Sequence, residues 1–410
     1  MKQKHIAMIS YHTCPLASEE GKETGGMNVY VLELSKALVA QGHKVDMFTR
    51  CSHVSNPHIV IIQPNLRLIH VKAGPSENVP KKKLIVYIPE FANAMQQFSI
   101  SENSHYDVYH CHYYLSGLIG LELNKGQSVR TPLIMSFHTL ALMKNLVARD
   151  ELEKEEIVRI TAETLLTEQV DYMIVPSVSE MNYLEYLYHA IPSKITVIPP
   201  GVDTNLFKPG DKNMAKDKIG AQKDENIILF VGRIEPLKGL DMLLYAMKVL
   251  VVKHPEIKAC LWIVGGDVSQ KQEAWSKQLK MLQQIREVLG ITTLVKFVGQ
   301  KTQHELPDYY NASEMVVMPS HYESFGMVSL EAMACGVPVI TTNVAGISQL
   351  IDKTHASLIT SVNNPLLLET QIKYLLTDSK SHAQISQELL SKARELDWSK
   401  VVKKIIAVYG

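Results

Sequence analysis

The chain has 410 residues, of which 46% are hydrophobic and 20% are charged. This composition excludes a disordered or low-complexity chain, and the length predicts two or three domains rather than one small module. Forty-two Lys and Arg balance 42 Asp and Glu, so the formal net charge is zero and no global field favours nucleic acid or an anionic membrane. Any anion must therefore be bound by a local site.

The five cysteines are scattered and lack any C-x-x-C spacing, so the sequence predicts neither a disulfide framework nor a structural zinc site. The apolar run after Met1 is too short for a signal peptide. The longest uncharged stretch, residues 333–351, contains Gly, Pro and polar residues and is not expected to span a membrane. We expect a cytoplasmic protein, with peripheral membrane contact and a homodimer left open.

Short apolar or β-branched runs alternate with longer stretches of helical period, and this pattern occurs twice along the chain. In the first half the expected strands are HIAMIS, KVDMFT, LRLIHV, YDVYHC, PLIMSF, YMIVPS and ITVIP, and helices are expected over Met27–Gln41 and Glu151–Gln169. In the second half the expected strands are IILFVG, ACLWIVG, VKFVG, MVVMPS and PVITT. Such alternation is typical of parallel sheets wrapped by helices, so the fold class is α/β with two doubly wound domains.

Pro and Gly cluster over residues 199–213, which places a domain boundary there. The expected domains are 1–200 and 201–395, followed by a closing helix over 396–410. That helix has one apolar face, which must pack on one of the domains; the face consists of Trp398, Val401, Val402, Ile405, Ile406 and Tyr409. Because ligands of open α/β sheets bind beyond the carboxyl ends of the strands, an inter-domain cleft is the expected site.

The segment TGGMNVYV, Thr24–Val31, follows the first strand and opens a helix. Gly25 and Gly26 allow backbone N–H groups to approach an anion, and the helix N-terminus adds partial positive charge. A phosphate would suit this segment. The alternative is a flexible turn before a helix.

The segment VGRIEPLKG places Arg233 and Lys238 in the loop after a strand. Two cations at this position can neutralise a diphosphate leaving group without a metal ion. The alternative is a solvated loop.

The stretch 319–340 carries two carboxylates, Glu323 in the loop after MVVMPS and Glu331 on the helix that follows. Carboxylates at such positions accept hydrogen bonds from sugar hydroxyls or from a ribose diol, and the SFGM loop between them offers backbone N–H groups. The alternatives are a surface carboxylate and an ordinary preference for acidic residues near a helix start.

His138 follows the strand PLIMSF and could bond a substrate hydroxyl, or serve the structure only. His110 and His112 share one face of the preceding strand, because successive side chains of a strand alternate. No third ligand at a recognisable spacing accompanies this pair, so no metal site is predicted.

Together and in this order, these segments resemble the retaining glycosyltransferases of family 4, which have the GT-B fold of two Rossmann-like domains facing across a cleft. The resemblance covers nearly the whole chain, and its most specific element is the pair Glu323 and Glu331 with seven residues between them. It implies a sugar transfer from a nucleotide diphosphate donor with retention of configuration and without a metal or other cofactor. It also implies that the closing helix returns to the first domain.

The resemblance assigns site residues as well. Gly25 and Gly26 would face the diphosphate, Arg233 and Lys238 would clamp it, and Glu331 would bind the ribose. The donor sugar would be held by Glu323 and by the backbone of Ser324, Phe325, Gly326 and Met327, with His138 near its hydroxyls. His138, Arg233, Lys238 and Glu323 would form the catalytic set.

Within the family, GGMNVYV, HYYLSG and HTLALMKN are similar to the branch of inositol-phosphate N-acetylglucosaminyltransferase and, more distantly, of sucrose-phosphate synthase. That branch binds the phosphate of its acceptor, and the residues at the matching positions are Asn28, Lys81, Tyr113, Thr139 and Arg159. Fixed cations make physical sense beside a diphosphate donor, because they offset the repulsion between two anions. Lys81 in its KKK run and Arg159 on its helix could also be solvated surface residues.

The sequence thus predicts a glycosyltransferase with a UDP-sugar donor and a phosphorylated acceptor, inositol phosphate or sugar phosphate. We expect front-face transfer, in which the leaving diphosphate helps to deprotonate the acceptor hydroxyl. A family member acting on a lipid-linked or glycan acceptor is the alternative. More remote are a non-catalytic sugar-nucleotide binder and an NAD-dependent dehydrogenase, whose G-x-G-x-x-G spacing is missing from IVGGDV.

Overall fold

The computed structural model describes residues 2–16, 25–268, 272–344, 346–351 and 358–410. These residues form two compact units, one of residues 1–201 with 398–410 and one of residues 202–397. The predicted segment Thr24–Val31 is described from Gly25 onward, and Thr24 lies outside the described residues.

The first unit is built on an eight-stranded sheet. Its strands are β1 (His5–Ile9), β2 (Lys44–Arg50), β3 (Ile59–Gln63), β4 (Leu66–Val71), β5 (Val108–His112), β6 (Leu133–Ser136), β7 (Tyr172–Val175) and β8 (Ile195–Val197). Its helices are α1 (Gly26–Ala40), α2 (Ile88–Ser101), α3 (Tyr114–Asn124), α4 (Ala141–Val147), α5 (Ile157–Gln169), α6 (Val178–Tyr188) and α15 (Trp398–Tyr409), with 3₁₀ turns η1 (Lys81–Tyr87) and η2 (Pro192–Lys194).

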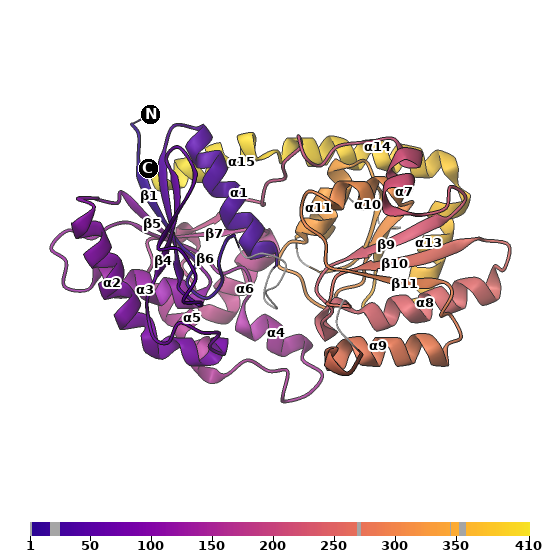
Figure 1. The fold of residues 1–410 in the computed structure, drawn as a ribbon, viewed down its shortest axis with the longest axis horizontal. Helices are drawn as coiled ribbons and strands as arrows, with labels where there is room; N and C mark the ends of the chain where they lie inside the picture. Colours follow the sequence, from indigo (N-terminus) through magenta and orange to yellow (C-terminus); the bar gives the residue numbers. More distant parts are fainter. Residues whose placement is uncertain (1, 17–24, 269–271, 345, 352–357) are drawn as a thin grey trace. The chain divides into compact units, whose positions relative to one another are not determined.

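The strand order of this sheet is β3-β4-β2-β1-β5-β6-β7-β8, and all neighbours are parallel except β3 and β4. Strands β1, β2 and β6 are almost wholly buried, because helices cover both faces of the sheet (Figure 1). The order reverses between β1 and β5, and ligands of open α/β sheets bind at the carboxyl ends of the strands beside such a reversal.

The second unit is built on a six-stranded sheet. Its strands are β9 (Asn226–Val231), β10 (Ala259–Val264), β11 (Val295–Gly299), β12 (Met315–Met318), β13 (Val339–Thr342) and β14 (Ile359–Thr360). Its helices are α7 (Lys212–Ile219), α8 (Leu240–Lys253), α9 (Lys277–Val288), α10 (Leu306–Ala312), α11 (Met327–Ala334), α12 (Ile347–Leu350), α13 (Pro365–Thr377) and α14 (Ser379–Glu395), with 3₁₀ turns η3 (Pro236–Lys238) and η4 (Gln272–Ala274).

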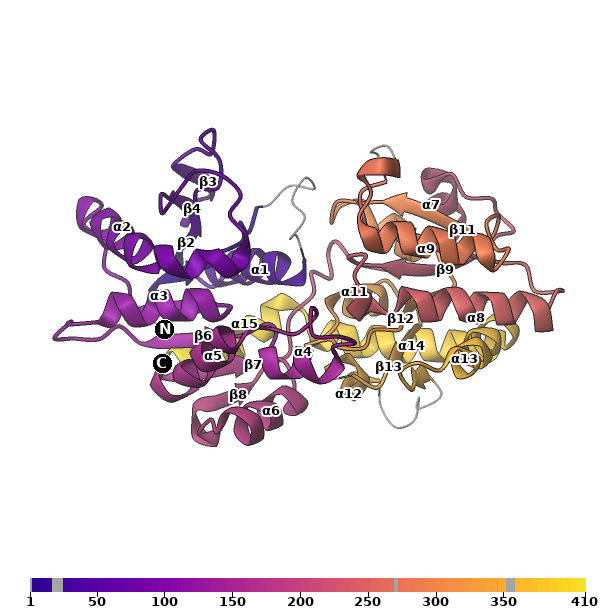
Figure 2. The same cartoon turned by 90° about the horizontal axis from the view of Figure 1, so that it is seen from below.

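The second sheet is parallel, with the order β11-β10-β9-β12-β13-β14. Renumbered within the unit, this order is 3-2-1-4-5-6, that of a Rossmann fold, and its reversal lies between β9 and β12. In this unit α8 and α9 lie on one side of the sheet, and α7 and α10 lie on the other (Figure 1). The view from below shows α8 and α9 on the side of the sheet that faces the viewer (Figure 2). Both units therefore have the predicted doubly wound α/β architecture.

The closing helix α15 packs on α1 of the first unit. Its apolar face is buried as the sequence indicates, and it includes Trp398, Val401, Val402, Ile405, Ile406 and Tyr409. The Tyr409 hydroxyl bonds Nδ1 of His110 at 2.7 Å, and Lys4 Nζ donates to the Tyr409 carbonyl at 3.1 Å. The two ends of the described chain are thus tied to one another within the first unit.

One sequence prediction about an element needs correction, and one strand was missed. Helix α5 begins at Ile157 rather than at residue 151, because the preceding turns hold Glu155 against Lys144 and Arg159. The edge strand β3, which pairs antiparallel with β4, was not predicted. In the described part of the chain, none of the helices is both long and apolar enough to cross a bilayer.

Candidate functional site

In the first unit, four of the five predicted acceptor residues, Lys81, Tyr113, Thr139 and Arg159, lie in one cluster around Tyr113, the residue directly after β5. Its backbone has a positive φ of 75°, and its side chain is 4% exposed. Lys81 Nζ lies 5.4 Å and the Arg159 guanidinium 4.8 Å from the centre of its ring, and both are cation–π contacts. The Tyr113 hydroxyl is buried and has no hydrogen-bond partner among the described residues. Two cations and an unpartnered hydroxyl are therefore fixed in one place.

Arg159 is held rigidly on α5 although only 3% of the residue is exposed. It donates from Nη2 to the carbonyl and hydroxyl oxygens of Thr139, at 2.8 and 3.0 Å. It also pairs with Glu155 at 2.9 Å and with Glu163 at 2.7 Å. A buried guanidinium needs such partners, because desolvation without them is costly. Thr139 and Arg159 are thus in direct contact.

The two carboxylates that hold Arg159 were missed by the sequence reasoning. Burial alone would raise the pKa of Glu155, but the neighbouring Arg159 and Lys144 cations lower that pKa to about 2. Glu163 also accepts hydrogen bonds from the Tyr188 hydroxyl and the Ala141 amide. Glu163 had a signal in the sequence, the i, i+4 spacing from Arg159 along one helix face, whereas Glu155 lies in the turn before α5.

Asn28 lies in the first turn of α1 and is 5% exposed. Its Nδ2 donates to Thr13 Oγ1 at 2.8 Å and to the Cys14 carbonyl at 2.6 Å, whereas its buried Oδ1 has no partner among the described residues. Gly25 precedes the helix in extended conformation, with φ of −167°, and it has no side chain with which to cap the first turn. The backbone N–H groups at this helix start are therefore not covered by a capping side chain.

His138 follows β6 and also has a positive φ, of 62°. Its ring lies against Tyr30 at 5.1 Å between centroids, and its Nε2 is 2.9 Å from Nδ1 of His112. Desolvation lowers the pKa of His138 to about 3, so the ring is neutral at physiological pH. Sequence reasoning placed His138 beyond its strand but missed its contact with His112.

In the second unit, the loops after β9 and β12 meet. Lys238 forms an ion pair with Glu323, and both side chains are largely buried. The Leu237 carbonyl accepts a hydrogen bond from the His321 amide at 2.8 Å, so the two loops are also joined through their backbones. Arg233 pairs instead with Glu235 at 2.8 Å and is half exposed. The structure therefore joins two of the predicted residues and holds Arg233 on a neighbouring carboxylate.

Glu331 is the fifth residue of α11 and lies in the middle of the helix rather than at its start. It is 3% exposed. It accepts a hydrogen bond from the Tyr310 hydroxyl at 2.7 Å and another from Gln303 Nε2 at 3.3 Å. Burial raises the pKa of Glu331 to about 7, and these two hydrogen bonds limit the rise. Tyr310 and Gln303 were missed, because they lie far from Glu331 in the sequence.

The backbone segment Ser324–Met327 runs into α11. Phe325 is buried, and its carbonyl accepts a hydrogen bond from the Ile347 amide at 2.8 Å. Gly326 has a φ of 101° immediately before the helix, a conformation that glycine adopts without strain. Met327 is the first residue of α11. The segment is thus fixed at the carboxyl edge of the second sheet, on the β12 side of its reversal point.

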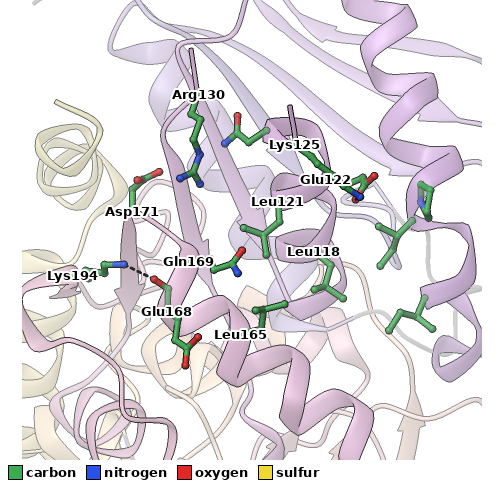
Figure 3. A pocket seen from close by; sticks show the side chains of 14 residues that line it. Leu118, Leu121, Glu122, Lys125, Arg130, Leu165, Glu168, Gln169, Asp171 and Lys194 are labelled. Carbon is green, nitrogen blue, oxygen red and sulfur yellow. Dashed lines mark hydrogen bonds and ion pairs between the residues drawn. The ribbon is translucent and has the colours of Figure 1, made fainter. Parts of the chain in front are cut away.

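A cavity of about 750 Å³ lies elsewhere on the first unit (Figure 3). Its lining combines Leu118, Leu121 and Leu165 with charged side chains that include Arg130 and Lys194 (Figure 3). None of the predicted site residues lines it. Lys194 is engaged by the carbonyl of Glu168 at 2.7 Å.

The histidines of β5 bond other side chains. Both ring nitrogens of His110 have partners, the hydroxyls of Tyr409 and Ser136. In the part of the chain that the structure describes, no group of three His, Cys, Asp or Glu side chains is arranged to hold a metal ion.

Comparison with known proteins identifies the family of this chain. Residues 24–206 match the family model described as Glycosyltransferase Family 4, and residues 211–389 match the one described as Glycosyl transferases group 1. A D-inositol 3-phosphate glycosyltransferase of Thermobispora bispora is 33% identical over 407 residues, which cover 98% of this chain and 94% of the relative. The enzyme of the same name from Geodermatophilus obscurus is 34% identical and is matched over 99% of this chain and 89% of the relative.

Solved structures agree. Sucrose-phosphate synthase from Thermosynechococcus elongatus has a TM-score of 0.89 and 29% identity, covering 99% of this chain and 98% of that one. Anabaena Alr3699/HepE, solved with UDP and glucose, has a TM-score of 0.74 at 18% identity over 99% of each chain and supports the fold alone. The protein is therefore an enzyme of the glycosyltransferase class with the GT-B fold. Within that class, the chain belongs to the family whose models, Glycosyltransferase Family 4 and Glycosyl transferases group 1, match residues 24–206 and 211–389, as the motifs predicted.

Proposed function

We propose that this enzyme transfers a hexosyl group, with retention of configuration, from a UDP-sugar to a phosphorylated small molecule, inositol phosphate or sugar phosphate. The first unit would bind the acceptor and the second unit the nucleotide-sugar. The names of the relatives support the acceptor, because both are called D-inositol 3-phosphate glycosyltransferases. The proposal takes its nucleotide from Alr3699/HepE, a protein of the same fold that was solved with UDP.

The observation that carries the proposal is the cluster around Tyr113. Lys81 and Arg159 both lie within 5.4 Å of its ring centre, and its hydroxyl is buried without a partner among the described residues. A phosphate group would accept hydrogen bonds from the hydroxyl and the ammonium group and would be stabilised by both cations.

In the second unit, Lys238 and Arg233 would stabilise the charge that develops on the leaving diphosphate, and Glu331 would accept hydrogen bonds from the ribose. Glu323, which Lys238 now holds, would accept hydrogen bonds from the donor sugar. The leaving diphosphate oxygen would take the proton of the acceptor hydroxyl as the new glycosidic bond forms on the same face. In this scheme the protein supplies positioning and electrostatic stabilisation rather than a nucleophile.

The test is nucleotide release from UDP-glucose, UDP-N-acetylglucosamine, ADP-glucose and GDP-mannose. Each donor is offered with inositol, fructose or glucose and with the phosphate of the same acceptor. Release with a UDP-sugar that only a phosphorylated acceptor stimulates is the expected result, and the configuration of the isolated product checks retention. Release that is indifferent to the phosphate would point to a lipid-linked or glycan acceptor instead.

The acceptor cluster is tested with Lys81→Ala and Tyr113→Phe. Both should raise the KM for the phosphorylated acceptor about tenfold or more and leave the affinity for the nucleotide unchanged, because each removes one phosphate contact. Lys83→Ala in the same lysine run is the matched control, since Lys83 is exposed. Arg159→Ala is less informative, because it would remove the cation paired with the buried Glu163 and one of the two cations paired with Glu155, and so destabilise the fold.

A further inference from the structure

Three histidine rings lie in a row in the first unit, with His110 and His112 on β5 and His138 in the loop after β6. The ring centroids of His110 and His112 are 4.3 Å apart, and those of His112 and His138 are 5.2 Å apart. Desolvation lowers the pKa of His110 and of His138 to about 3, and it also lowers that of His112. All three rings are therefore neutral near pH 7, and each carries its single proton on one of its two nitrogens.

The partners of His112 decide where its proton lies. Its Nε2 is 3.4 Å from the thioether sulfur of Met8, and both residues are fully buried. A thioether has no proton to give and is only a weak acceptor. A proton on Nε2 can therefore be donated to the sulfur, whereas a lone pair on Nε2 would face the lone pairs of the sulfur. Met8 thus favours the tautomer of His112 that has its proton on Nε2.

In that tautomer Nδ1 of His112 is a hydrogen-bond acceptor, and it lies 2.9 Å from Nε2 of His138. A hydrogen bond at this distance needs one proton, which His138 must then supply from its own Nε2. We propose that His112 is a positioning residue that holds His138 as the Nε2–H tautomer, so that Nδ1 of His138 accepts a hydrogen bond from a hydroxyl of the donor sugar. The sugar contact in this statement rests on the proposed function.

The surroundings of His138 are consistent with this role. Its Nδ1 has no hydrogen-bond partner among the described residues, and this nitrogen is not fully buried. The positive φ of 62° and the packing against Tyr30 fix the direction of the ring. A neutral ring with its proton on Nε2 can accept at Nδ1 but cannot donate there. The site would therefore select a sugar that has a hydroxyl, rather than an acceptor-only group, at this position.

The tautomer can be measured without any substrate. In the full chain labelled with ¹⁵N-histidine, the resonances of His138 are those that disappear in His138→Gln. We expect a protonated, pyrrole-type shift for its Nε2 and an unprotonated, pyridine-type shift for its Nδ1. The opposite pattern, or two equally populated tautomers, would overturn the proposal.

Variants of His112 test whether it sets the tautomer. His112→Gln keeps a side-chain oxygen able to accept from His138, so the Nε2–H form should persist and kcat should stay within a few-fold of the parent. His112→Leu has no acceptor, so His138 should become a mixture of tautomers and kcat should fall about tenfold or more. Equal loss in the two variants without a change of tautomer would show a structural role and contradict the proposal.

Met8→Leu should weaken the preference for the Nε2–H tautomer, because it removes the sulfur and keeps the volume. Met135→Leu is the matched control, since Met135 is equally buried in the neighbouring β6 and its sulfur lies against Gly117 of α3. It should leave the resonances of His138 unchanged. Identical shifts in Met8→Leu and in the parent would contradict the assigned role of Met8.

Modified donors test the sugar contact. For the hydroxyl that His138 accepts from, replacement by fluorine should reduce kcat/KM as strongly as replacement by hydrogen, because fluorine donates no hydrogen bond. Full activity with every deoxyfluoro sugar would contradict the sugar contact. If no nucleotide-sugar is turned over at all, the proposed function fails, whereas the tautomer measured in the free protein still decides whether His112 orients His138.

Discussion

Lys238 forms an ion pair with Glu323 in the proposed donor site, and loss of the Lys238 side chain alone should reduce turnover. Lys238→Ala should lower kcat roughly 30- to 1000-fold, which corresponds to a loss of about 2–4 kcal/mol of stabilisation at the leaving diphosphate. Nucleotide release under saturating substrates measures this. Lys218→Ala removes the lysine of an exposed pair with Asp308 in the same unit and should leave kcat unchanged. Unaltered turnover in Lys238→Ala would refute the clamp.

Glu331 makes a prediction about pH and stability. Its pKa is raised from an ordinary value of 4.5 to about 7. Below pH 4.5 the group is protonated in both the folded and the unfolded chain, and between pH 4.5 and 7 only the unfolded chain loses the proton. The free energy of unfolding therefore falls as the pH rises through this window, by about 3 kcal/mol in total, and the loss is complete above pH 7.

Glu331→Gln removes this titration and keeps an oxygen that can accept from Tyr310. The variant should gain stability relative to the parent as the pH rises from 4.5 to 7, and the difference should be constant above pH 7. Urea unfolding of the two proteins at pH 5, 6, 7 and 8 measures it. A difference that does not change with pH would show that Glu331 has an ordinary pKa.

The sequence could predict which residue types follow which strands, because glycines, cations and carboxylates at strand ends are visible in it. It could not predict their pairings. Tyr310 and Gln303 were missed because only the folded backbone brings them within hydrogen-bond distance of Glu331. Glu163 was missed although it lies four residues after Arg159, since the spacing alone does not show that the pair is buried. The functional roles of the site residues stay predictions for the experiments above.

Among the elements, the turn from η3 into α8 positions Lys238. Gly239 has a φ of +63°, and a side chain there would collide with the carbonyl oxygen of Pro319 in the loop after β12. Gly239→Ala should separate the two loops and reduce kcat at least tenfold, since Lys238 and Glu323 lie on opposite sides of this contact.

The matched control for this turn is Gly220→Ala at the end of α7. Gly220 has a φ of +70° but no neighbouring atom within 4 Å of an added side chain. It should lose about 1 kcal/mol of stability from backbone strain and keep its kcat. Equal effects of the two substitutions on kcat would show that the close approach to Pro319 does not matter.

Elements buried on both faces were easier to predict than exposed ones. Strands such as β1 and β9 are continuous apolar runs, and such runs stand out in a sequence. Strand β3 lies at the edge of its sheet and is not fully buried at any position. It pairs antiparallel with β4 and no helix separates the two strands in the sequence, so the alternation of strands and helices did not reveal it. The charged stretch 151–156 has high helix propensity, but Glu155 and Glu156 pair with Lys144 and Lys82, which lie outside α5.

At the scale of the whole molecule, we predict that the first unit binds the acceptor and the second unit binds the nucleotide. In hydrogen exchange, UDP alone should protect the loops after β9 and β12, around residues 232–239 and 320–327. Inositol phosphate alone should protect the loops after β5 and β6, around residues 113 and 139. The expected cause is the ordering of backbone by direct contact. Protection of the same loops by both ligands would contradict separate sites.

The alternation of strands and helices was enough to predict two parallel sheets, because crossovers between parallel strands need a helix each time. The positions of the reversals were not readable in the same way. That β1 and β5, or β9 and β12, become neighbours depends on how long-range strand pairs compete, and no local pattern encodes this.

The route of the chain has a consequence for its synthesis. The first unit contains residues 1–201 and 398–410, so the whole of the second unit is inserted between two of its parts. Where the chain passes between the units, near residues 202 and 397, the two segments are hydrogen-bonded to each other, since the Val202 amide donates to the Leu396 carbonyl at 2.9 Å. During synthesis on the ribosome, α1 cannot pack against α15 until all of residues 202–397 have been made. The unit that begins first is therefore completed last, and a chaperone would meet its exposed α1 surface during that interval.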